Sequence, residues 1–245
     1  MAICVTGGSS GLGRAVAERF ATTGNDVFIN YHADDDAAAE AAAAVEAKGA
    51  TAHLLKVDVT TPGGAAELMS AIAAKADRLD QLVHAAAKTV SGPLLECPPD
   101  ELDDAIRLNG TALVHLVREA LPLLGEGSTV FFLSSRGARR VIPNYGSLGT
   151  AKALSEHIVR YLAVELAARG VRVNTVAPGA VDTKAFRAMF PDTYEERLAA
   201  AAKANPTGRG VELSDAADLV EVLSRPEFSM VNGQTISVDG GVSLL

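Results

Sequence analysis

Cysteine is scarce in this chain of 245 residues. The two cysteines, Cys4 and Cys97, lie far apart and have no Cys or His close by in the sequence. This pattern excludes a disulfide scaffold and a zinc ribbon, and it fits a reducing compartment. We therefore expect no metal site and a cytoplasmic location.

An excess of basic residues and a long apolar run are also missing. The formal net charge is −8, which argues against non-specific binding to nucleic acid. No apolar stretch approaches the length of a membrane span. The apolar residues 2–5 run directly into a glycine loop without the basic start of a signal peptide, so they are predicted to form a strand. We expect neither nucleic acid nor a membrane as a partner.

Short apolar runs alternate with longer, Ala-rich amphipathic stretches. Strands separated by helices indicate βαβ units and a parallel sheet covered on both faces. No repeat or linker interrupts the pattern, so it predicts one α/β domain over residues 1–245, with a doubly wound, Rossmann-like parallel sheet of about seven strands. The predicted strands are 2–6, 26–31, 52–58, 80–86, 128–134, 171–177 and 235–238, and the predicted helices are 12–23, 35–48, 64–75, 99–124, 147–169, 184–203 and 214–224.

A glycine-rich loop joins the first strand to the first helix. Its sequence is Thr6-Gly7-Gly8-Ser9-Ser10-Gly11-Leu12-Gly13. Gly7 permits a tight turn, Gly11 lets the backbone approach a pyrophosphate, and Gly13 allows close packing of helix on strand. The N–H groups at the start of the helix then face the phosphates, so the loop predicts a dinucleotide site.

The spacing G-x-x-x-G-x-G resembles that of the short-chain dehydrogenase/reductase family, and the resemblance extends along the whole chain. It includes residues 57–59, residues 82–87 in place of the family's N-N-A-G, Ser134-Ser135, Lys152, residues 178–183 as P-G-x-[VI]-x-T, and residues 238–241. The resemblance implies a nicotinamide dinucleotide in contact with Gly7, Ser9, Ser10, Gly11, Leu12, Gly13, Tyr31, His32, Asp58, Val59, Ala85, Ala86, Lys152, Pro178, Gly179, Val181 and Thr183.

The chain departs from the family signature Tyr-x-x-x-Lys. Leu148 stands four residues before Lys152, and the nearest tyrosine is Tyr145, seven residues before it. This spacing resembles that of the enoyl-acyl-carrier-protein reductases of the superfamily. The C-terminal half of this chain most resembles the group of these reductases that keeps the classical TGxxxGxG loop, at residues 144–145, 160–166, 205–209 and 233–241.

The longer spacing has a geometric meaning. On a regular helix, residues four and seven apart share a face, but their axial separation is about 6 Å in one case and about 10.5 Å in the other. Tyr145 is therefore predicted to sit farther out, over the substrate, where it donates a hydrogen bond to the enolate oxygen of an enoyl thioester. Lys152 is predicted to hold the ribose hydroxyls. Reduction of a ketone instead needs the acid close to the carbon that receives hydride.

Other positions leave alternatives open. Tyr145 could be an ordinary loop tyrosine in a chain that has lost catalysis. Ser135, seventeen residues before Lys152, either orients substrate or is a plain strand-end serine. The family's active-site asparagine falls near Arg107 and Asn109, with no safe carry-over, and His84 is interpreted as a structural histidine.

The end of the second strand bears on the choice of coenzyme. It carries no Asp or Glu to bind a ribose 2′-hydroxyl. Asn30, Tyr31, His32 and Ser9 could accept a 2′-phosphate, although no Arg or Lys is in place there, and the acids at 34–36 argue against it. The resemblance favours NADPH, with NADH as the other possibility.

Residues 184–203 are predicted to form a substrate lid, since the family has a mobile lid here. Its apolar Phe186, Met189 and Phe190 would cover an acyl group, or simply pack on the core. A basic cluster of Arg136, Arg139, Arg140, Lys184 and Arg187 could meet the phosphates of coenzyme A or an acyl carrier protein, or be plain solvated charge.

Three functions follow as hypotheses. The favoured one is NADPH-dependent reduction of a 2-enoyl thioester, linked to coenzyme A or acyl carrier protein, in fatty-acid or specialised-metabolite synthesis. The second is a carbonyl reductase that uses Tyr145, and the third is a non-catalytic dinucleotide sensor or scaffold. The resemblance also implies a homotetramer formed through residues 99–124 and 147–169 and the C-terminal strand.

Overall fold

Seven short runs rich in Val, Ile, Leu and Phe form one parallel sheet. The structure, a computed structural model, describes residues 1–245. The strand order is β3-β2-β1-β4-β5-β6-β7, which confirms the predicted α/β, Rossmann-like fold. The strands are β1 Ala2–Thr6, β2 Asp26–Tyr31, β3 Thr51–Lys56, β4 Gln81–His84, β5 Thr129–Leu133, β6 Arg172–Pro178 and β7 Thr235–Val238.

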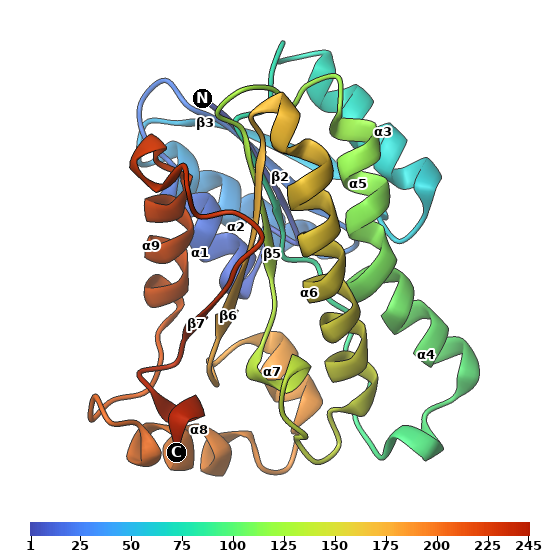
Figure 1. Ribbon diagram of the computed structural model, residues 1–245, viewed down its shortest axis with the longest axis vertical. Coiled ribbons are helices and arrows are strands. Elements are labelled where there is room, and N and C mark those ends of the chain that lie inside the picture. The colour runs from blue at the N-terminus through green and yellow to red at the C-terminus, as the bar shows by residue number, and fades with distance from the viewer.

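Helices cover both faces of the sheet (Figure 1). On one face lie α1 Gly11–Arg19, α2 Asp35–Glu46 and α9 Leu213–Ser224, and on the other lie α3 Pro62–Ala73, α5 Ala112–Ala120 and α6 Gly146–Leu166. The helix α4 Pro99–Ile106 precedes α5, while α7 Lys184–Met189 and α8 Tyr194–Ala204 lie beyond the carboxyl ends of the strands. No helix is both long and apolar enough to span a membrane.

Alternation along the strands divides the apolar core into two layers. In β5, Val130 and Phe132 pack beneath α3, α5 and α6, while Phe131 and Leu133 pack beneath α1 and α9. All four side chains are buried. Burial on both faces explains why these strands read as continuous apolar runs in the sequence.

The helix predicted over 99–124 differs from the structure at its centre. A π-helical turn, Arg107–Thr111, separates α4 from α5, and α5 ends at Ala120. A π turn needs partners outside the regular helical ladder. The Ser155 hydroxyl of α6 lies 3.0 Å from the Asn109 carbonyl oxygen and 2.9 Å from that of Gly110, and it supplies such a partner.

The stretch predicted as helical over 184–203 is two helices. The chain leaves the helical conformation at Phe190, before Pro191, because proline disfavours the α conformation in the residue that precedes it. The second helix, α8, then begins at Tyr194.

His84 joins three elements at the end of β4. Its Nδ1 lies 2.7 Å from the Thr6 hydroxyl of β1, and its Nε2 lies 2.9 Å from the Leu108 carbonyl oxygen of the π turn. The ring is fully buried, and burial lowers its pKa to about 4. The neutral ring donates to Leu108 and accepts from Thr6, which agrees with the interpretation of His84 as a structural residue.

His84 should make the fold sensitive to acid. Its pKa is about 4 in the folded chain and about 6.5 in the unfolded chain, so protons favour unfolding as the pH falls between these values. Between pH 7 and pH 5, protonation of His84 should therefore lower the free energy of unfolding by about 2 kcal/mol. Urea unfolding at both pH values should show this decrease in the free energy of unfolding in the native protein, and it should be missing in the His84→Asn variant. An equal loss in both proteins would contradict the assignment, and any general destabilisation by Asn cancels in the comparison.

Candidate active site

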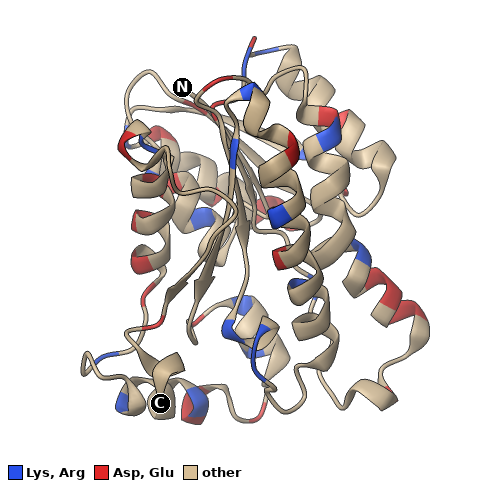
Figure 2. Ribbon diagram, viewed as in Figure 1, with Lys and Arg blue, Asp and Glu red and all other residues tan.

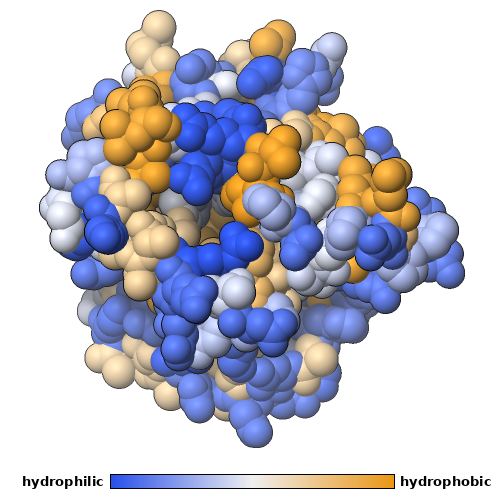
Figure 3. Space-filling view, turned by 90° about the horizontal axis from the view of Figure 1, so that it is seen from below, coloured by the Kyte–Doolittle hydropathy of each residue, from blue (hydrophilic) through white to orange (hydrophobic).

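A cavity of about 740 Å³ opens at the carboxyl ends of the strands. Figure 3 looks at this end of the molecule and shows it hollowed near the centre, with hydrophilic and hydrophobic atoms around the opening. The structure brings all seventeen predicted dinucleotide contacts into the lining of this cavity, together with Ser135 and Tyr145. Two lid residues, Phe186 and Met189, also line it, while Phe190 does not.

The glycine loop lies directly against the end of β4. Gly7 has a φ of +64°, and a Cβ there would lie 2.7 Å from the Cα of Ala86. A Cβ at Gly13 would collide with the Gly7 carbonyl oxygen, so no larger residue fits this cradle. A Cβ at Gly13 would also lie 3.2 Å from the Cβ of Ala85 after β4, so Gly13 permits close packing against the loop and against the strand end.

The first helix has an N-terminus that no side chain caps. Ser10 makes no capping hydrogen bond, whereas Asp34, Thr61 and Thr183 cap α2, α3 and α7. The first N–H groups of α1 are thus available to an anion in the cavity. A glycine cradle with an uncapped helix start fits the pyrophosphate of a dinucleotide.

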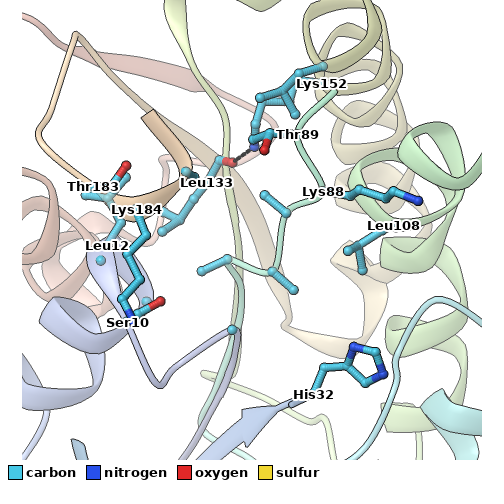
Figure 4. Close-up of a pocket in the computed structure, with 18 of the residues that line it drawn as sticks. Ser10, Leu12, His32, Lys88, Thr89, Leu108, Leu133, Lys152, Thr183 and Lys184 are labelled. Atoms are coloured by element: carbon cyan, nitrogen blue, oxygen red, sulfur yellow. Dashed lines mark hydrogen bonds between the residues drawn. The ribbon is translucent and has the colours of Figure 1, made fainter. Parts of the chain in front are cut away.

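The side chains at the end of β2 divide into two groups. Asn30 is buried, and its amide donates to the carbonyl oxygens of Leu55 and Val57 at 3.2 and 2.9 Å. Asn30 is therefore not available for a 2′-phosphate, in contrast to the possibility raised from the sequence. Asn30, Tyr31 and His32 all line the cavity, and Figure 4 shows His32 at its lower end.

Tyr145 is held against Ser135. Its hydroxyl donates to the Ser135 Oγ at 3.0 Å, and the same oxygen accepts from the Gly137 N–H at 3.0 Å. The ring lies on Gly137, where a Cβ would lie 2.5 Å or less from its edge. Burial raises the pKa of Tyr145, so the phenol stays protonated at neutral pH and is a hydrogen-bond donor.

Lys152 is a buried cation beside the same strand end. Its amine donates to the Leu133 carbonyl oxygen at 2.6 Å and lies 4.9 Å from the centre of the Phe132 ring. Burial lowers the pKa of Lys152 to about 8. The amine is therefore mostly charged at neutral pH and loses that charge in mildly alkaline solution.

Glu156, a buried carboxylate one helical turn after Lys152, was not among the residues predicted from the sequence. The Ser134 hydroxyl donates to Glu156 Oε1 at 2.6 Å, and Arg139 Nε lies 3.5 Å from Oε2. The negative charge of Glu156 opposes the lowering of the Lys152 pKa. The available signal was an acid four residues after Lys152, on the face of α6 that the helix buries.

Asn109 lies behind the cavity wall. Its side-chain amide donates to the carbonyl oxygens of Lys88 and Ala105 at 2.8 and 3.0 Å. Its neighbours Arg107 and Leu108 line the cavity, but Asn109 does not. Asn109 thus supports the wall and the π turn.

The stretch predicted as a lid contributes to an apolar cluster over Tyr145. Leu148, Met189 and Phe190 are buried together, and the Phe190 ring stacks on Tyr145 with centroids 6.2 Å apart. The Ser91 hydroxyl donates to the Met189 carbonyl oxygen at 2.7 Å, and this hydrogen bond links the end of α7 to the loop after β4. Leu148, at the position of the family's usual tyrosine, therefore forms part of an apolar wall.

Three of the five cations in the basic cluster noted in the sequence are paired with acids of the chain. Arg187 makes two hydrogen bonds of 2.7 Å to Asp182, and Lys184 binds Asp34 at 2.9 Å. Arg139 faces Glu156, and Arg140 donates to carbonyl oxygens of the C-terminal residues. Figure 2 shows basic residues gathered on and beside α7, where a phosphate-bearing substrate would compete with these internal partners.

Comparisons with known proteins agree with this geometry. Residues 7–243 match the family model described as Enoyl-(Acyl carrier protein) reductase. The chain is 32% identical to the 1-cyclohexenylcarbonyl-CoA reductase of Streptomyces collinus over 241 residues, which are 98% of this chain and 86% of that protein.

Solved structures resemble the chain over nearly its full length. A short chain dehydrogenase from Burkholderia cenocepacia J2315, in complex with NADP, has a TM-score of 0.89 and 31% identity, with 99% of this chain and 97% of that chain covered. The angucycline C-6 ketoreductase LanV with bound NADP has a TM-score of 0.90 and 29% identity, with 100% and 96% covered.

Glu156 should tune the charge of Lys152. We expect NADPH affinity to fall as the pH rises through about 8, because Lys152 loses its proton there. In Glu156→Gln the fall should occur about one pH unit lower, since a nearby opposite charge is lost. Fluorescence titration of NADPH from neutral to alkaline pH measures this, with exposed Glu165→Gln on the same helix as control. Coincident profiles for native protein and Glu156→Gln would refute the role.

Proposed function

Because this chain belongs to the short-chain dehydrogenase/reductase family of NAD(P)-dependent oxidoreductases, we propose that it uses NADPH to reduce the carbon–carbon double bond of a 2-enoyl thioester. The observation that carries the proposal is the position of Tyr145. It begins α6 seven residues before Lys152 and lies over the cavity, while the apolar Leu148 occupies the place of the family's usual acid.

Reduction of an enoyl thioester separates the two reacting ends of the substrate. When bound, reduced nicotinamide supplies a hydride, which an enoyl thioester accepts at its β-carbon. Negative charge then develops on the thioester oxygen, two bonds beyond the α-carbon, and a proton from water adds to the α-carbon to complete the reduction. A donor placed toward the start of α6 suits that distant oxygen better than one beside the hydride-accepting carbon.

Tyr145 and Ser135 together form the proposed oxyanion donors. The Ser135 oxygen accepts hydrogen bonds from the Tyr145 hydroxyl and from the Gly137 N–H. The Ser135 hydroxyl hydrogen is therefore left to donate to an oxygen in the cavity. Because burial keeps Tyr145 protonated, the phenol can turn its own hydrogen to the same oxygen as charge develops.

Lys152 is proposed to hold the ribose hydroxyls of the coenzyme and to add positive field. Leu148, Phe186 and Met189 give the cavity an apolar wall suited to an acyl group. The name of the Streptomyces relative describes a thioester conjugated with a ring double bond, and the matching family model is also described as an enoyl reductase. Both support an enoyl thioester as substrate, and the NADP-bound structures support NADPH.

A carbonyl substrate is the second candidate. The 3.0 Å hydrogen bond between Tyr145 and Ser135 pairs an acid with an orienting serine, which also suits protonation of a ketone oxygen. The resemblance to the LanV ketoreductase favours the same chemistry.

Replacing the phenol should separate catalysis from coenzyme binding. We expect Tyr145→Phe to lower kcat by about 10²–10³, because one oxyanion donor is lost, with little change in NADPH affinity. Tyr161→Phe, an exposed tyrosine on the same helix, should leave both quantities unchanged. Unchanged turnover in Tyr145→Phe would exclude Tyr145 from the chemistry.

The choice of substrate is tested by NADPH consumption with a trans-2-enoyl thioester and with a β-ketoacyl thioester, using NADH as comparison. We expect turnover of the enoyl thioester with NADPH. Turnover of the ketone alone would replace the proposal with the second candidate. Tight NADPH binding with no turnover of either substrate would favour a non-catalytic sensor or scaffold.

A further inference from the structure

The glycine-loop end of the coenzyme cavity is lined by one cation. Four Lys and Arg residues line the cavity: Lys88, Arg107, Lys152 and Lys184. Figure 4 shows Lys88 on the wall opposite the glycine loop, next to Leu108, whereas Lys184 reaches down to Ser10 of that loop. Lys152 lies at the far strand end, where its amine meets a carbonyl oxygen of β5. Of these four cations, Lys184 is the one placed to meet the phosphates at the start of α1, while Arg14 and Arg187 line a neighbouring pocket beside the same loop.

The backbone fixes the stem of Lys184 beside the loop. Thr183 caps α7 by accepting the Phe186 N–H at 3.0 Å, so Lys184 is the first residue of that helix. Thr183 also packs against the loop, because a Cβ at Gly11 would lie 3.3 Å from its methyl carbon. The lysine therefore starts at the glycine loop whatever its amine binds.

The amine has one carboxylate partner, and that partner belongs to another element. Lys184 Nζ lies 2.9 Å from Asp34 Oδ2 at the start of α2. The two side chains are 72% and 52% exposed, so water screens the pair and its breakage costs little. The neighbouring cations are held more firmly: Arg187 by two bonds to Asp182, and Arg14 by two different glutamates.

We propose that Lys184 is a coenzyme-binding residue whose amine leaves Asp34 and binds the pyrophosphate of the dinucleotide. The uncapped N–H groups of α1 bind the same pyrophosphate from the other side. A pyrophosphate carries two negative charges where Asp34 carries one, so the amine gains from the exchange. Because Lys184 begins the lid, coenzyme bound in this way ties the first turn of the lid to the glycine loop.

The inference rests on the coenzyme named in the proposed function and needs no substrate. Dissociation constants for NADPH, NADH and ADP-ribose can be measured by calorimetry on the whole protein. Lys184→Met removes the charge and keeps an unbranched stem. Asp34→Asn frees the amine and retains a residue that caps helices well. Lys203→Met, an exposed lysine of α8 in the same lid, is the charge-matched control.

Lys184→Met should raise the dissociation constants of all three ligands by about tenfold, because each ligand contains the pyrophosphate. Asp34→Asn should lower the same dissociation constants by roughly two- to threefold. The double variant should bind like Lys184→Met, because Asp34 acts only by competing for the amine. Lys203→Met should bind like the native protein.

Other outcomes are equally clear. A loss confined to NADPH would move the Lys184 contact to the 2′-phosphate and overturn the pyrophosphate assignment. Native affinities in Lys184→Met would leave Lys184 and Asp34 as an ordinary surface ion pair. Absence of NADPH and NADH binding in the native protein would instead count against the proposed function.

Discussion

The site depends on one topological constraint, the separation of the chain at β1 and β4. These strands are neighbours in the sheet, but the chain leaves β1 toward β2 and leaves β4 toward β5, so their connections diverge. A crevice must open between them at the carboxyl edge. At the bottom of this crevice, the Thr6 hydroxyl accepts hydrogen bonds from the backbone N–H groups after β4 and donates one to the His84 ring. The glycine loop can then lie on the end of β4 without a side chain between them.

Burial determines the protonation states within the crevice. It acts in opposite directions on the two main groups, raising the pKa of the Tyr145 phenol and lowering that of the Lys152 ammonium. The phenol stays a donor across the neutral range, whereas the lysine charge is close to being lost. A buried carboxylate at Glu156 is therefore useful, because it favours the charged lysine and is itself held by Ser134 and Arg139. This arrangement supports the positive field that the proposed reaction requires.

Local sequence patterns predicted the parts of the structure that depend on nearest neighbours. The order of strands and helices and the glycine loop follow from periodicity and turn residues, and the cavity collects the residues expected from the family motifs. What the sequence did not show depends on partners distant along the chain. Asn30 is committed to β3, and the π turn is stabilised from α6 by Ser155. A local sequence pattern cannot show which polar side chains already form hydrogen bonds with an element distant along the chain.

The two cations of α7, Lys184 and Arg187, differ in how readily their carboxylate partners can be exchanged for a ligand. Arg187 and its partner Asp182 are five residues apart and share two hydrogen bonds of 2.7 Å, so a ligand gains little by competing for that arginine. Lys184 and Asp34 are 150 residues apart and join two elements on opposite sides of the crevice. Because both side chains are largely exposed, the ion pair can be exchanged for a contact with another anion at little cost. In the proposed exchange, a phosphate on the glycine loop replaces Asp34 as the partner of the amine at the first residue of α7.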